Sequence, residues 1–102
     1  MSGHDLVTFV ATRLADEVDS ALRMGNMLVT QHEALGMSLE VAEKQARLQL
    51  HTAEMRQALF VDTVRPYLGT AGPTGRIAEQ QLRMLAAMNS GHPDYRPEWR
   101  PQ

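Results

Sequence analysis

The chain contains no cysteine, so it can form no disulfide bond, no thiolate metal site and no cysteine nucleophile. Aromatic residues make up only 5% of the 102 residues, so Ala, Leu, Val and Met must fill most of the core. No uninterrupted apolar run approaches the roughly 18 residues that a membrane span needs. The first residues lack a basic stretch followed by an apolar one, so we expect no secretory signal and a cytoplasmic protein.

A strong charge of either sign is also absent. The formal net charge is −2. Residues 1–37 hold two basic and five acidic residues, residues 38–75 hold four of each, and residues 76–102 hold four basic and three acidic. No segment has the basic excess that binding to a phosphate backbone requires, and an acidic first helix would repel a duplex. We therefore expect neither nucleic-acid nor membrane binding.

Apolar residues spaced by three and four predict an all-α protein, and no segment alternates with the period of a strand. The first helix is predicted from the N-cap Asp5 to about Leu35, with Gly25-Asn26 as either a kink or a break. Its apolar stripe is Leu6, Phe9, Val10, Leu14, Val18, Ala21 and Leu22, and its opposite face carries Arg13, Asp16, Glu17 and Asp19.

The second helix is predicted over residues 39–64, which contain neither Gly nor Pro. Gly36 is a natural residue to close the first helix, and Ser38 a natural N-cap for the second. This short turn predicts an antiparallel hairpin. The core stripe is Leu39, Ala42, Ala46, Leu50, Ala53, Phe60 or Val61, and Val64; a second apolar line is Val41, Leu48, Met55 and Leu59. So wide an apolar surface indicates contact with a further helix or with another chain, and we expect a homodimer.

Residues 69–75 contain three Gly and one Pro, which predicts a loop. Its glycines do not match a phosphate-binding pattern. A third helix is predicted over residues 76–89, with Thr74 as its cap and the stripe Ile77, Gln81, Leu82, Met84, Leu85 and Met88. The predicted fold is a long antiparallel helical hairpin plus a shorter third helix, forming a bundle domain over residues 1–90, followed by an extended aromatic tail over residues 91–102.

The tail holds the only Trp, one of two Tyr and three of five Pro. Its prolines are incompatible with a helix, and residues 92–95 suit a type I turn. Two interpretations of Tyr95, Arg96 and Trp99 stay open. The tail is an intramolecular latch, with Trp99 packed on its own bundle, or a recognition peptide for another protein, in which Trp and Arg are typical anchors, and the two do not exclude each other.

The remaining candidate site is a basic cluster on one face of the second helix, formed by Lys44, Arg47 and His51. It is either a partner-binding surface or a solvated face neutralised by neighbouring Glu side chains. The four histidines lack the spacing of a zinc protease or a di-iron bundle, so no metal and no cofactor are expected. No nucleophile elbow is present, and no catalytic residue is assigned.

Both ends of the chain resemble a family of small uncharacterised actinobacterial and actinophage proteins, a domain of unknown function. Residues 5–17 resemble the family's LVxFLxxRLxxDE-like start, and His92 to Trp99 match its HPDYRxxW end without a gap. Residues 40–44 and 48–51 resemble a helix between these blocks. The chain departs from the family in its Met-rich middle without Cys. The resemblance implies an origin in actinobacteria or their phages and no activity.

These observations predict a non-enzymatic helical protein–protein interaction module that self-associates. Two alternatives remain. One is a small phage-type or actinobacterial regulator that contacts nucleic acid. The other is a metal-binding or ligand-binding protein whose site lies at a dimer interface.

Overall fold

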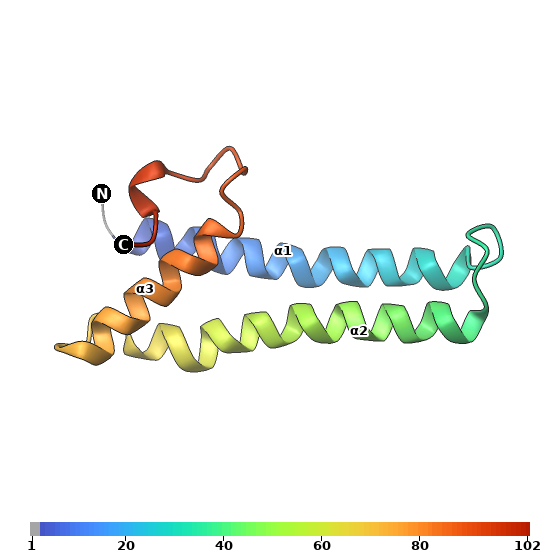
Figure 1. Cartoon of the computed structure of the whole chain (residues 1–102), viewed down its shortest axis with the longest axis horizontal. Helices are drawn as coiled ribbons and strands as arrows, with labels where there is room; N and C mark the ends of the chain where they lie inside the picture. Colours follow the sequence, from blue (N-terminus) through green and yellow to red (C-terminus); the bar gives the residue numbers. More distant parts are fainter. Residues whose placement is uncertain (1–2) are drawn as a thin grey trace. The chain divides into compact units, whose positions relative to one another are not determined.

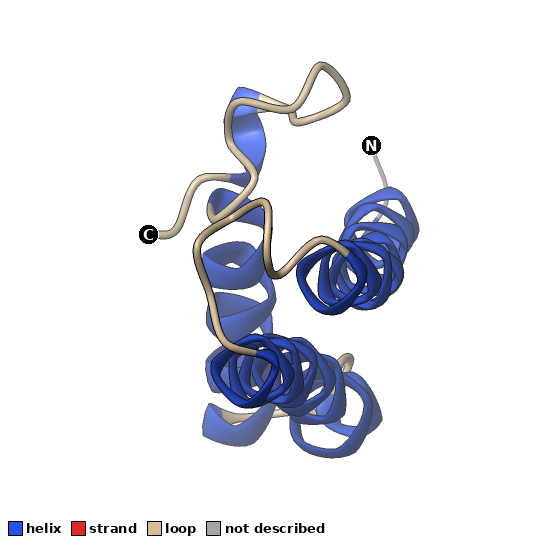
Figure 2. Cartoon of the chain, turned by 90° about the vertical axis from the view of Figure 1, so that its right-hand side faces the viewer, coloured by secondary structure: helices blue, strands red, loops and turns tan. Residues whose placement is uncertain are grey.

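The computed structural model describes residues 3–102, which form an all-α fold without strands (Figures 1 and 2). Two long helices, α1 (Gly3–Thr30) and α2 (Leu39–Ala58), pack as a hairpin, and α3 (Pro73–Ala87) is shorter. Between α2 and α3 the chain forms a π-helix, η1 (Leu59–Val64), and a 3-10 turn, η2 (Arg65–Tyr67). A last 3-10 turn, η3 (Pro97–Trp99), lies within the otherwise non-helical tail. The predicted fold class is confirmed.

The chain divides into two compact units. The hairpin unit comprises residues 14–57, which are most of α1, the connecting turn and nearly all of α2. The tail unit comprises the start of α1 up to Arg13 together with residues 58–102. No helix in the described part of the chain is long and apolar enough to cross a membrane.

Helix α1 runs through Gly25-Asn26 without a break. Gly25 is buried, and a Cβ atom at this position would lie 3.0 Å from Cβ of Ala46 on α2. The glycine therefore allows the two helices of the hairpin unit to approach closely. Small residues dominate this contact, since Ala42 and Ala53 are also buried. Leu22, predicted for the stripe, is exposed, whereas Leu14 and Leu28 on the same helix are buried.

The turn between α1 and α2 follows from local chemistry. Gly36 has a φ of 72°, the N–H of Met37 donates to the carbonyl of His32 (2.8 Å) and that of Gly36 to the carbonyl of Glu33 (3.0 Å). This pair of bonds is a Schellman motif, which closes a helix with a left-handed residue. The Oγ of Ser38 then accepts from the N–H of Val41 (3.2 Å), as an N-cap does. The predicted roles of Gly36 and Ser38 are both confirmed.

Replacing Gly36 with Ala is expected to lower the free energy of unfolding by about 1–2 kcal/mol, because an L side chain is disfavoured at this φ. Gly36→Asn is the matched control, since Asn tolerates the left-handed region better than Ala. Chemical denaturation followed by circular dichroism measures both variants. Equal losses for Ala and Asn would contradict this explanation of Gly36.

The predicted second helix, 39–64, is a single α-helix only as far as Ala58. Phe60 and Val64 are almost completely buried in the π-helix η1, as predicted for their stripe. Pro66 lies in the first turn of η2, and the helical path ends there. Sequence periodicity therefore placed Ala42, Ala53 and Val64 correctly but was wrong for Leu39, which is 45% exposed, and it could not distinguish α from π hydrogen bonding.

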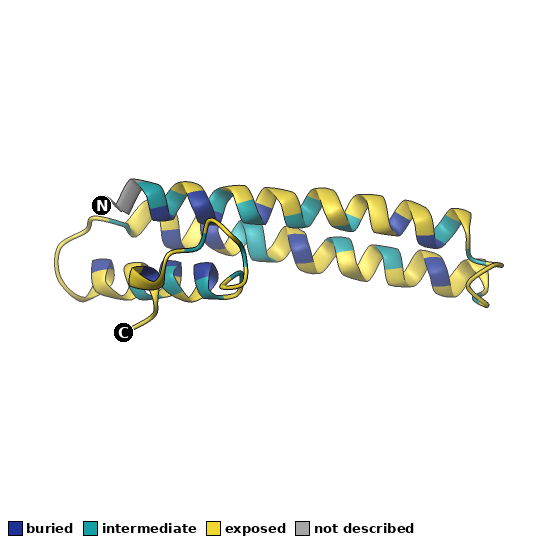
Figure 3. Cartoon of the chain, turned by 90° about the horizontal axis from the view of Figure 1, so that it is seen from above, coloured by how far each residue is buried: buried dark blue, intermediate teal, exposed yellow. Residues whose placement is uncertain are grey.

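Helix α3 begins at Pro73, three residues before the predicted start, with Pro73 rather than Thr74 defining its first turn. The cap position belongs to Gly72, which has a φ of 80°. The predicted stripe was partly wrong, since Ile77, Gln81, Met84 and Met88 are exposed. The buried face keeps Leu82 and Leu85 of the predicted stripe and adds three small residues, Gly75, Ala78 and Ala86. In Figure 3 buried stretches (dark blue) alternate with exposed ones (yellow) along the helices.

Candidate functional site

The tail carries an aromatic cluster that is built around Phe9 of α1. The Phe9 ring centroid lies 5.2 Å from that of Trp99, 6.0 Å from that of Tyr95 and 5.7 Å from that of His92. Tyr95 and Trp99 also meet edge to face, at 5.9 Å. Trp99 is only 5% exposed. Of the two interpretations of the tail, the intramolecular latch is the one seen here.

A turn at the start of the tail holds His92 against α1. The N–H of Tyr95 donates to the carbonyl of His92 (3.0 Å), which confirms the predicted turn. Nδ1 of His92 accepts from the N–H of Asp94 (3.0 Å), and the Arg13 guanidinium contacts Nε2. Arg13 also lies over the Phe9 ring, 5.8 Å from its centroid. The prediction that Arg13 faces solvent was therefore wrong, and its position four residues after Phe9 was the signal that it shares the Phe9 face.

Arg96 lies over the Trp99 indole, with Cζ 5.3 Å from the ring centroid. Its Nη1 is also 3.5 Å from Oδ2 of Asp5. Both side chains of this ion pair are about half exposed, so the pair itself contributes little to stability. Arg96 therefore acts chiefly as a cover over the indole. The structure brings three predicted site residues, Tyr95, Arg96 and Trp99, together in one place.

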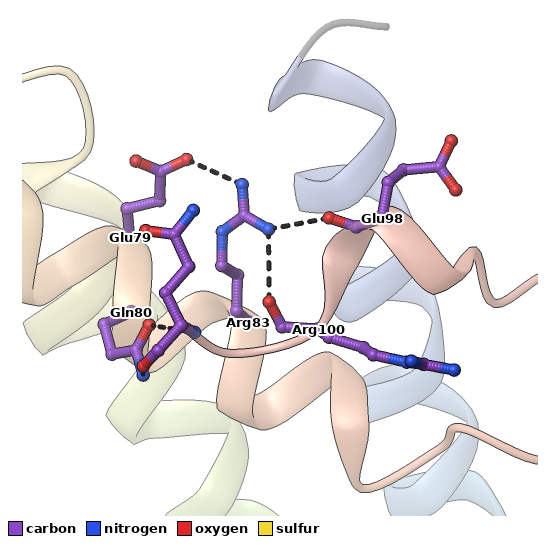
Figure 4. Close-up of polar contacts among 6 residues, drawn as sticks. Glu79, Gln80, Arg83, Glu98 and Arg100 are labelled. Atoms are coloured by element: carbon purple, nitrogen blue, oxygen red, sulfur yellow. Dashed lines mark hydrogen bonds and ion pairs between the residues drawn. The ribbon is translucent and has the colours of Figure 1, made fainter.

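Helix α3 holds the end of the tail through two side chains (Figure 4). Nη1 of Arg83 donates to the carbonyls of Glu98 (2.9 Å) and Arg100 (3.4 Å), while its Nη2 lies 3.4 Å from Oε1 of Glu79. Gln80 pairs with Gln102 twice: Nε2 donates to the carbonyl (2.9 Å), and Oε1 accepts from the N–H (3.1 Å). Every one of these bonds to the tail reaches a main-chain atom. Sequence reasoning missed Gln80 and Arg83, because their partners are distant in sequence.

The basic cluster belongs to the hairpin unit. Lys44, Arg47 and His51 are all exposed on α2. No group of three His, Asp or Glu side chains in the described residues is arranged to hold a metal ion. Elsewhere in this unit, the Glu17 carboxylate pairs with Arg56, so Glu17 does not lie on the solvent face predicted for it.

The second apolar line predicted for α2 is exposed. Val41 is 51% exposed, Leu48 63% and Met55 52%, and these residues are called the α2 line below. They recur every seven residues, which is close to two helical turns, so they share one face of the helix. Ala42 and Ala53, on the face used by the hairpin, are at most 2% exposed. Within the described chain the α2 line is therefore a surface separate from the hairpin contact.

Comparison with known proteins identifies a family and no activity. Neither the curated proteins nor the solved structures include a match to this chain. The model of a family of unknown function, DUF6221, matches residues 3–101 and so covers α1, the hairpin, α3 and the tail. This match agrees with the resemblance of the two ends to a family of unknown function. The chain is a member of the DUF6221 family.

Proposed function

We propose that this protein is a helical protein–protein interaction module that self-associates through the α2 line. The observation that carries this proposal is the exposure of three large apolar side chains on one face of α2. Single exposed apolar residues are ordinary on protein surfaces. Three at a spacing of seven form one of the two apolar lines of a helix that packs against another helix, and the positions between them that would form the other line are polar here.

A second copy of the chain suits this surface. Two copies present the same line to each other, as a two-fold interface requires. Burying one large aliphatic side chain contributes about 1.5–3 kcal/mol, and a dimer would cover the line of both copies. The face of α2 that carries Ala42 and Ala53 is already used by the hairpin, and the α2 line is an exposed apolar surface on another side of this helix.

The residues that border the α2 line are compatible with pairing. Gln45 and Thr52 lie four residues after Val41 and Leu48 and form an uncharged border. Lys44 and His51 lie three residues after the same two positions and form a basic border, with Arg47 beside them. Polar rims around an apolar centre are the usual anatomy of an interface. The basic cluster is thereby proposed as the rim of this interface rather than as a phosphate site.

Cysteine cross-linking tests the proposal cleanly, because the natural chain has no cysteine. Leu48→Cys is expected to form a disulfide-linked dimer under mild oxidation, since two copies would place this position together. Glu43→Cys, equally exposed on another face of α2, is the matched control and should remain largely monomeric. Non-reducing electrophoresis and mass spectrometry measure both. Equal cross-linking at the two positions would contradict the proposal, because it would mean that the chains meet only by random collision.

A further inference from the structure

The polar contacts between α3 and the tail share an unusual property. On the tail, Arg83 and Gln80 bond only to main-chain atoms of Glu98, Arg100 and Gln102. These hydrogen bonds do not involve the side chains of the three tail residues. They would hold any segment that presents its carbonyls and N–H groups at the same places.

The specific part of the contact is Trp99. Its indole is buried against Phe9, is covered by Arg96 and follows Pro97 by two residues. Main-chain bonds that supply affinity, together with one pocket that selects a side chain, are how extended peptides are recognised by protein domains. A buried Trp beside an Arg is also the typical composition of an energetic centre in an interface.

We propose that the surface formed by Phe9, Gln80 and Arg83 is a peptide-binding site, and that the tail of a second copy can occupy it in place of the chain's own tail. The chemistry it recognises is a segment with Pro two residues before Trp in a 3-10 turn and with Arg on either side. Every copy of the chain carries one such segment. Exchange of an identical element between copies is an accessible route to association.

The geometry around the tail is compatible with exchange. The segment that joins α3 to the tail is largely exposed, and a Cβ at Gly91 would meet nothing within 4 Å. An open hollow of about 320 Å³ lies beside Trp99, lined in part by Thr8, Thr12 and Asp94. The indole can therefore leave its site on that side without passing through the core. This surface is separate from the α2 line, so the inference does not depend on the proposed function.

The first test uses the full chain with Trp99→Ala and a synthetic peptide of residues 91–102. The variant keeps Phe9, Gln80 and Arg83 but cannot fill the pocket. Saturating peptide is expected to raise its Tm by at least about 5 °C, because a ligand that binds only the folded state stabilises it. The peptide's Trp, then the only one present, should shift its emission to the blue.

Two controls separate this effect from nonspecific association. The same peptide carrying Trp99→Ala should leave the Tm of the variant unchanged. The natural chain should show no rise in Tm with either peptide, because its own tail competes at an effective concentration of about millimolar. If Trp99→Ala does not fold, the full chain with Trp99→Phe takes its place, since a ring then remains against Phe9. A folded variant that neither shifts in Tm nor changes the peptide's emission would overturn the proposal.

The second test asks whether a whole second copy serves as the occupant. A chain with Gln80→Ala and Arg83→Ala keeps an intact tail but has a damaged site. Its Trp emission is expected to be shifted to the red when alone and to move to the blue when the Trp99→Ala chain is added. Peptide binding without this change in the mixed chains would contradict exchange between copies. If the Trp emission of the double variant alone is already shifted to the blue, then Gln80 and Arg83 do not hold the tail. This result would also overturn the proposal.

Discussion

Replacing Trp99 with Ala is expected to lower the free energy of unfolding by about 3–5 kcal/mol. The indole is 5% exposed and lies against Phe9 and Tyr95, so its removal leaves a cavity and uncovers Phe9. The loss should be concentrated in the tail unit, because Phe9, α3 and the tail all belong to it. Hydrogen exchange should therefore show lost protection in α3 and at the start of α1.

Tyr67→Ala is the control for this prediction. Tyr67 is also an aromatic residue of the tail unit, but it is 47% exposed. Its removal should cost roughly 1 kcal/mol or less, because little of its surface is taken from solvent. Urea denaturation compares both variants with the natural chain. A Trp99→Ala loss no larger than that of Tyr67→Ala would mean that the tail does not close this unit.

Replacing Gly75 with Ala is the second change with a large expected effect. A Cβ at Gly75 would lie 1.7 Å from the carbonyl oxygen and 2.8 Å from the carbonyl carbon of Thr70. Both are main-chain atoms, so neither can rotate away as a side chain would. Either the loop before α3 or the first turn of α3 must move. Overpacking of this kind costs about 1–3 kcal/mol when side chains can adjust, and we expect a loss at or above the upper value.

The control for Gly75 is Gly91→Ala, where the added Cβ would meet nothing within 4 Å. This substitution should leave the Tm nearly unchanged. The natural chain, Gly75→Ala and Gly91→Ala are compared by calorimetry. For a domain of this size, a loss of about 3 kcal/mol lowers the Tm by roughly 12–24 °C. Comparable Tm values for the two variants would contradict the close approach of Thr70 to α3.

Features set by neighbouring residues were predictable from the sequence. Gly36 and Ser38 form the turn between α1 and α2 because a left-handed C′ residue and a hydroxyl N-cap are local requirements. The turn at His92 likewise follows from Pro93 at its second position. Burial of Val64 was also predictable, because helical periodicity places it on the core stripe, whereas periodicity left Phe60 and Val61 as alternatives.

Features set by contacts between distant segments were not predictable. On α3, the predicted stripe grouped Ile77 and Met84 with Leu82 and Leu85. Only tertiary packing determines that the two Leu are buried, together with Ala78, while Ile77 and Met84 stay exposed. The hydrogen bonds from Arg83 to the tail were not predictable either, because they join segments that are distant in the sequence. Their acceptors are main-chain carbonyls, which no pattern of side chains reveals.

The α2 line lies between these two cases. Its period was visible in the sequence, and two kinds of partner were open: a further helix of the same chain or another chain. Within the hairpin unit its three residues are more than half exposed. We propose the second kind of partner, in the form of a second copy of the chain, and this is the central claim of this account.

The most direct test of that claim is the solution mass of the full chain, measured by size exclusion with light scattering. We expect about 23 kDa, twice the 11.4 kDa of one chain. Leu48→Glu should reduce the mass to that of one chain, because it places a charge in the centre of the α2 line. Ile77→Glu, which adds the same charge at an exposed apolar position of α3, should leave the mass at the dimer value. A natural chain that stays at 11.4 kDa at high protein concentration would contradict the claim.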